Sequence, residues 1–205
     1  MNALYNPSVR STEFDTKRPI ASMAAILRGI FFAPRSFYLN FRAEGPLREA
    51  VLFVLLVSAV CGILSAAVNF AYAAISGTVD VSLLEVMAVN LAFTVLGPLV
   101  VGLFSGAYLL SVRTFVGPEG EYLQVYRILA YAWGAAVLFW IPGLNAFAFT
   151  YAMLVLVLLG IRYVYRVSLL TALVAALVGY VPSSILFILL IRLGVFATGL
   201  EPAGP

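Results

Sequence analysis

Long apolar runs separated by short charged or glycine-containing segments make up most of the chain after residue 46. The first run, residues 47–74, has no charged residue after Glu49, and the second covers residues 87–112. A helix needs about 20 residues to cross the hydrocarbon core of a bilayer, so each run predicts one membrane-spanning helix. Gly97 and Pro98 interrupt the second run, and we expect a break or kink there.

The third apolar stretch, residues 128–161, is too long for one ordinary crossing and holds Pro142, Gly143 and Asn145 near its middle. Division at this turn gives segments 128–144 and 146–161, each about 17 residues or about 25 Å of helix. These segments predict either two full crossings or a re-entrant hairpin that turns inside the protein. The last run, residues 168–191, contains Pro182, where we expect a bend.

These runs together predict an all-α fold, a polytopic membrane helix bundle with five transmembrane helices. The transmembrane domain covers residues 47–192, and residues 193–205 form a short C-terminal tail.

The N-terminal part of the chain follows a different pattern. Residues 1–19 are polar and predict a mobile tail. Residues 20–46 place apolar side chains at helical spacing, and Pro34 suits the first turn of a second short helix. They predict amphipathic interfacial helices that lie on the cytoplasmic membrane surface or, alternatively, pack on the protein's own cytoplasmic face. The candidate lipid or partner contacts are Arg28, Phe32, Arg35, Phe37 and Arg42.

Composition and charge distribution agree with this topology. The chain is 63% hydrophobic and 10% charged, with a mean hydropathy of +1.07, which is too apolar for a soluble core of 205 residues. Seven of the 12 basic residues precede residue 49, and four more lie in the second and fourth connections between runs. This positive-inside pattern predicts a multi-pass protein of the cell membrane with a cytoplasmic N-terminus and a C-terminus on the opposite side. The net charge of +3 is therefore explained by anionic lipid rather than by nucleic acid.

The sequence contains few residues that could form a catalytic site within the apolar runs. The chain has no histidine, which removes the commonest general base and metal ligand. The GLFSG sequence from Gly102 to Gly106 resembles the surroundings of an intramembrane protease serine, but the only lysine, Lys17, lies outside the apolar runs. We therefore predict no catalytic residue, cofactor or metal, and interpret Gly102 and Gly106 as a helix-packing motif.

Several stretches together resemble the Yip domain family of five-span membrane proteins. They are FFAPRSFYLNF, VGPEGEYLQVYRILAYAW, IPGLN and LVLLGIRYVYRVSLLTAL, in this order between residues 26 and 190. The resemblance implies a cytoplasmic N-terminus, five spans and, for the eukaryotic relatives, vesicle trafficking with small-GTPase partners. The chain lacks the Tyr-Gly-Pro-aromatic stretch that those relatives carry before the first span, and it is more similar to the prokaryotic members.

We therefore expect a non-enzymatic scaffold, membrane-organising or trafficking-type protein that acts through contacts with membrane lipids and with a protein partner or a second copy. One alternative is a small-solute transporter or channel with its site near Gly97, Pro98, Pro142 and Asn145, where broken helices free backbone groups. The predicted spans hold no ionisable group near their middle, which counts against ion coupling. A second alternative is an accessory subunit of a larger membrane complex.

Overall fold

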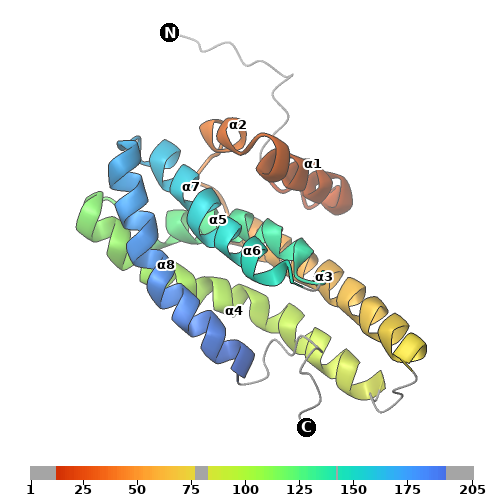
Figure 1. The fold of residues 1–205 in the computed structure, drawn as a ribbon. Coiled ribbons are helices and arrows are strands. Elements are labelled where there is room, and N and C mark those ends of the chain that lie inside the picture. Colours follow the sequence, from red (N-terminus) through yellow and green to blue (C-terminus); the bar gives the residue numbers. More distant parts are fainter. Residues whose placement is uncertain (1–12, 77–82, 142, 193–205) are drawn as a thin grey trace.

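The computed structural model describes residues 13–76, 83–141 and 143–192, and the regular structure in these ranges is helical (Figure 1). Within these residues, four helices are long and apolar enough to cross a membrane: Leu47–Tyr72 within α3 (Leu47–Ser76), Met87–Phe115 within α4 (Leu83–Phe115), Asn145–Val164, and Leu169–Leu190 within α8 (Leu169–Arg192). The all-α fold with several apolar spanning helices is confirmed. The predicted span at residues 128–144 is not among these four, so the count of five spans is not confirmed.

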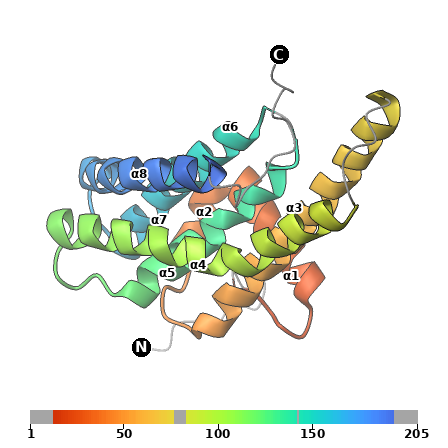
Figure 2. The same cartoon turned by 90° about the horizontal axis from the view of Figure 1, so that it is seen from below.

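The segment at residues 122–138, which includes most of this predicted span, is the most enclosed of the described residues. Helix α5 (Tyr122–Ala132) begins at Tyr122 rather than at residue 128 and passes into a 3-10 segment, η1 (Trp133–Leu138). Each residue from 125 to 136 is buried. The segment lies between α3, α4 and the later helices, as Figures 1 and 2 show. It therefore forms the centre of the bundle.

The next predicted span, 146–161, is a single helical rod with a change of winding in its middle. It consists of α6 (Asn145–Thr150), a π-helical segment η2 (Tyr151–Leu156) and α7 (Val157–Val164). Before it, Gly143 has a φ of 83°, a left-handed conformation that glycine adopts without steric cost. Asn145 then accepts a hydrogen bond from the Ala146 N–H at 2.8 Å through its side chain. Pro142 and both predicted tails, apart from residues 13–19, lie outside the described residues.

Several glycines and prolines lie inside the spanning helices α4 and α8. Pro98 and Pro182 both lie inside continuous helices, so no helix ends at these positions. A Cβ at Gly97 would lie 2.7 Å from Ser58 Oγ, and this small residue therefore lets α3 approach α4. The two glycines of the predicted packing motif lie in different surroundings. Gly102 faces the Tyr122 hydroxyl, whereas a Cβ at Gly106 would meet no atom within 4 Å.

The two N-terminal helices, α1 (Pro19–Phe32) and α2 (Pro34–Leu39), lie along one side of the bundle (Figure 1). Pro34 begins α2, as its position in the sequence predicts. The inner side of α1 is buried, and its Ile30 carbonyl accepts a hydrogen bond from Tyr151 Oη at 2.6 Å. Phe31 also stacks on the Tyr151 ring, with 6.1 Å between the ring centroids. This side of α1 therefore packs on the protein's own helices.

Candidate functional site: a charged cleft at one end of the bundle

The structure places the five predicted contacts of the N-terminal region in two environments. Arg28, Phe32, Arg35 and Arg42 are exposed, and Phe32 retains 85% of its accessible surface. Phe37 is only 5% exposed and packs against the Phe41 and Tyr131 rings. The burial of Phe37 follows from the position of α2 against the bundle. Phe37 is therefore a core residue in this structure and not a surface contact.

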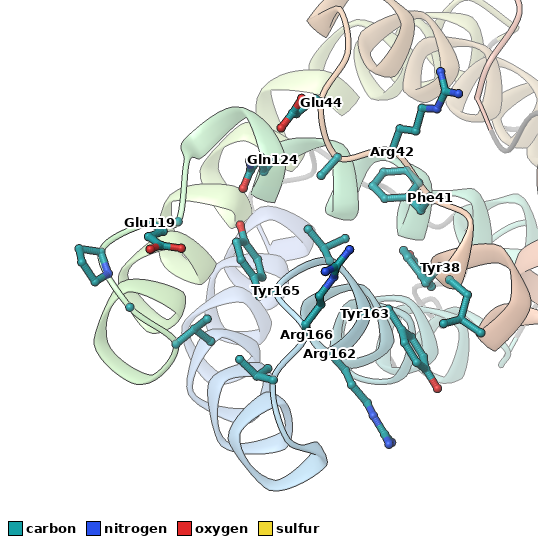
Figure 3. A pocket seen from close by; sticks show the side chains of 18 residues that line it. Tyr38, Phe41, Arg42, Glu44, Glu119, Gln124, Arg162, Tyr163, Tyr165 and Arg166 are labelled. Carbon is teal, nitrogen blue, oxygen red and sulfur yellow. The ribbon is translucent and has the colours of Figure 1, made fainter. Parts of the chain in front are cut away.

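A polar cleft of about 1150 Å³ lies at the end of the bundle where α2, α4 and α7 end (Figure 3). Three chain segments line it: residues 38–44 from the end of α2 onwards, the α4–α5 connection with Gln124 of α5, and residues 162–167 from the end of α7 onwards. Because the end of α4 and the end of α7 line the same cleft, the chain between residues 122 and 164 leaves this end of the bundle and returns to it.

Arg127 holds the first of these segments in place. Its guanidinium group has no exposed surface and donates hydrogen bonds to the Pro46 carbonyl at 3.0 Å and the Arg42 carbonyl at 3.4 Å. A Cβ at Gly45 would lie 2.6 Å from this guanidinium group, so the close approach requires glycine there. The same group lies 3.8 Å from a carboxylate oxygen of Glu13. Arg127 thus connects α5 to the wall of the cleft.

Local backbone geometry shapes the other two segments. Gly117 has a φ of 142°, and Arg113 Nε donates a hydrogen bond to the Gly120 carbonyl at 3.2 Å, which closes the α4–α5 loop. Between α7 and α8, Arg166 has a φ of 54°. This left-handed conformation is uncommon for a residue with a Cβ and costs of order 1 kcal/mol or more. Ser168 Oγ then accepts a hydrogen bond from the Thr171 N–H at 3.1 Å as α8 begins.

Both signs of charge line the cleft. Arg162 and Arg166 come from the α7–α8 turn, whereas Glu44 and Glu119 come from the other two segments. In Figure 3 the two glutamates and Gln124 lie along one side, and the Arg166 side chain lies across from them. Among the residues that the structure describes, these two glutamates and two arginines form no ion pair within 4.0 Å. The cleft therefore presents separated, unpaired charges.

Two tyrosine hydroxyl groups in the walls have unused hydrogen-bonding capacity. Tyr38 Oη and Tyr165 Oη are buried and have no hydrogen-bond partner among the described residues. Burial, with a smaller contribution from Glu121, raises the pKa of Tyr165 to about 12, and burial also raises the pKa of Tyr38. Both hydroxyls therefore keep their protons at neutral pH and remain potential donors.

The cleft was not predicted from the sequence, although its charged residues were recognised. Glu119 lies in the second connection between apolar runs, and Arg162 and Arg166 lie in the fourth. Their positions in the connections between apolar runs indicated that they lie at helix ends. Which helix ends meet depends on how the helices pack, and this information is not contained in the local pattern.

Comparison with known proteins identifies one family. Residues 28–193 match the family model described as the Yip1 domain, which covers well over half of the chain. The match includes α2 to α8, all three segments that line the cleft, and the C-terminal part of α1. No curated protein and no solved structure matched the chain.

Proposed function

We propose, from the premise that this chain belongs to the Yip1 domain family, that it is a non-enzymatic membrane-organising protein whose N-terminal helices contact the bilayer. The basic residues before the first span and in the connections support a position in the cell membrane, with these helices and the cleft on the cytoplasmic side. Membrane lipids are the first partners in this proposal, and a protein partner or a second copy would act on the same surface.

The outer side of α1 is the observation that carries the proposal. Ile20 is 72% exposed and Phe32 is 85% exposed, and Arg28 is an exposed basic residue between them. Exposed large apolar side chains beside an arginine are unfavourable in water but suit the boundary between acyl chains and phosphate groups. The inner side of the same helix is already covered by the bundle. We therefore infer that α1 contacts the protein on one side and lipid on the other.

The attachment of α1 to the bundle suggests how it would affect the membrane. Tyr151 binds the Ile30 carbonyl and stacks on Phe31, so α1 keeps a fixed position relative to the spanning helices. A rigid helix that occupies space in one leaflet only would expand that leaflet relative to the other. This asymmetry favours curved membranes, which is a physical route to membrane organisation without catalysis.

The described interior favours this proposal over a conduit for solutes. Trp133, Tyr131 and Phe104 are fully buried, and the Trp133 ring lies 6.3 Å from that of Phe104. Aromatic side chains thus fill the space between α3, α4 and α5 where a transport path would run. The polar groups there have local partners: Trp133 Nε1, for example, donates a hydrogen bond to Ser58 Oγ at 3.1 Å.

The proposal can be tested by reconstituting the full-length protein into large vesicles that contain anionic lipid. We expect the wild-type protein to shift the distribution of vesicle diameters, measured by electron cryomicroscopy, towards smaller values. Phe32→Ala and Arg28→Ala should reduce this shift, because they remove the apolar and the phosphate contact of α1.

Ile185→Ala provides the matched control. Ile185 is 56% exposed on α8, a spanning helix, so its truncation also removes an exposed apolar side chain but leaves α1 intact. It should leave the vesicle diameters as in the wild type. Equal diameters for wild-type protein, Phe32→Ala and protein-free vesicles would refute the proposal.

A further inference from the structure

The cleft has features of a binding site that the proposed contact of α1 does not use. Its walls come from three separate segments that Arg127, the Arg113–Gly120 hydrogen bond and the α7–α8 turn hold in place. Its charged side chains have no ion-pair partner among the described residues. A set of unpaired charges in a concave polar site is expected to bind a ligand of complementary charge.

Arg166 is the basic group best placed for such a ligand. Its side chain extends into the cleft, whereas Arg42 and Arg162 extend away from it (Figure 3). Its backbone adopts a left-handed conformation, with φ at 54°, which glycine would adopt without strain. The guanidinium fork of arginine suits paired phosphate oxygens. A phosphate group is therefore the chemistry that Arg166 would recognise.

The opposite side of the cleft argues against a purely anionic ligand. Glu44 and Glu119 face the space across from Arg166 (Figure 3), and they would repel a second negative charge. They are instead suited to an ammonium group. A ligand that carries both a phosphate and an ammonium group would pair with both sides at once. This requirement selects a zwitterionic headgroup of the phosphoethanolamine type.

An apolar groove beside the cleft favours a lipid over a soluble compound. The groove has a volume of about 380 Å³ and is lined by α4 residues from Ala107 to Phe115 together with Val178 and Pro182 of α8. Phe115 belongs to this groove, and the next residue, Val116, lines the cleft. An acyl chain along the groove would leave its headgroup at the level of the cleft.

We propose that this cleft binds the headgroup of a phosphatidylethanolamine-type lipid, with the phosphate at Arg166 and the ammonium group at Glu119, while Glu44 adds to the negative charge of the same side. The binding site is separate from the outer side of α1. It would hold individual lipid molecules of one headgroup class, whereas α1 contacts the bilayer as a whole. The Tyr165 hydroxyl beside Gln124 is a further donor in the same wall.

The experiment uses the purified full-length protein in detergent, titrated with phosphatidylethanolamine or phosphatidylglycerol, and native mass spectrometry to count bound lipids. The wild-type protein should retain phosphatidylethanolamine at least about tenfold more strongly than phosphatidylglycerol, as expected when charged hydrogen bonds are gained on both sides. Arg166→Gly should lose this retention while the protein stays folded, because glycine relieves the left-handed backbone. Arg166→Lys should retain part of it, since the positive charge remains.

Further variants test the role of the acidic side and the specificity of the effect. Glu119→Gln should reduce the preference for phosphatidylethanolamine over phosphatidylglycerol, because it removes the carboxylate proposed to bind the ammonium group. Arg48→Gln is the control: Arg48 is an exposed arginine outside the cleft, and its replacement should leave retention unchanged. Equal or stronger retention of phosphatidylglycerol by the wild type, or unchanged retention by Arg166→Gly, would overturn the proposal.

Soluble competitors separate a lipid from a free headgroup compound. Phosphoethanolamine and inorganic phosphate lack acyl chains, and we expect neither to displace the lipid at concentrations close to that of the lipid. Displacement by phosphoethanolamine at such concentrations would overturn the assignment to a lipid. None of these measurements depends on vesicle shape, so the result for the cleft is independent of the result for α1.

Discussion

Arg127 has a fully buried guanidinium group, and its surroundings only partly compensate for the loss of water. Two backbone carbonyls accept its hydrogen bonds, Glu13 lies 3.8 Å away, and the Tyr131 ring centroid lies 5.8 Å from its Cζ. Its Nε has no partner among the described residues. Burying a charge in this way contributes little net stability, but removing one partner is costly. Arg127 therefore serves mainly to fix the positions of the segments around it.

The hydrogen bond between Trp133 and Ser58 leads to a prediction at this scale. Both side chains are fully buried, and Ser58→Ala would leave the indole N–H without its acceptor. We expect a loss of about 1 kcal/mol in the free energy of unfolding, measured by SDS titration in mixed micelles with tryptophan fluorescence as the signal.

Ser105→Ala is the matched control for this prediction. Ser105 is also fully buried, but its hydroxyl donates to the Val101 carbonyl of its own helix. Its removal leaves no donor unpaired, so the change in the free energy of unfolding should be close to zero. A larger loss for Ser105→Ala than for Ser58→Ala would contradict the role assigned to the indole hydrogen bond.

At the scale of helices, α4 and α8 meet through a glycine that the sequence pattern did not single out. A Cβ at Gly179 would overlap the Tyr108 ring, and the Tyr108 hydroxyl donates a hydrogen bond to the Met153 carbonyl. Ser111 Oγ also donates to the Ala175 carbonyl at 2.6 Å. The Tyr108 ring therefore cannot move away from Gly179 without breaking its hydrogen bond to the Met153 carbonyl.

We expect Gly179→Ala to lower the free energy of unfolding by about 1 to 3 kcal/mol, because the new methyl group forces α4 and α8 apart. Gly106→Ala should instead be neutral or stabilising by up to about 1 kcal/mol, since a Cβ there meets no atom and alanine is the better helix former. The same SDS titration measures both variants. Equal destabilisation would show that Gly106 also packs against a neighbouring surface.

The helices themselves were largely predictable, because the long apolar runs contain the roughly 20 residues that a membrane crossing needs. Pro34 was also a recognisable first residue of a helix. The exception is α5. Arg127 lies in a connection between apolar runs, and its burial depends on residues 42–46, which are more than 80 residues away in the chain. The helix continues through Pro98, in agreement with the single span predicted for residues 87–112.

At the scale of the whole molecule, the path of the chain between the two connections that line the cleft decides the number of crossings. Helix α5 together with η1 rises about 28 Å, because a 3-10 segment rises about 2 Å per residue rather than 1.5 Å. The following rod, Asn145–Val164, is long enough to span. Both limbs thus approach the thickness of the hydrocarbon core, about 30 Å, and we propose that the turn at Gly143 reaches the far side.

Cysteine labelling tests this topology. In a Cys61→Ala background, Glu119→Cys and Leu144→Cys introduce single thiols at the two ends of the hairpin, and Leu144 is already 39% exposed. We expect a membrane-impermeant maleimide to label Glu119→Cys only from the cytoplasmic side and Leu144→Cys only from the opposite side. Labelling of Leu144→Cys only after detergent is added would instead indicate a re-entrant hairpin.

The N-terminal helices are synthesised first, but the residues on which they pack, near α5 and η2, are synthesised much later. Phe14 donates its backbone N–H to Tyr131 Oη at 3.1 Å, 117 residues away, and Ile30 meets Tyr151 across 121 residues. These partners reach the membrane only after most of the chain has been translated. The N-terminal helices therefore leave the ribosome first but complete their packing late, and until then their apolar sides need lipid or a chaperone as a temporary neighbour.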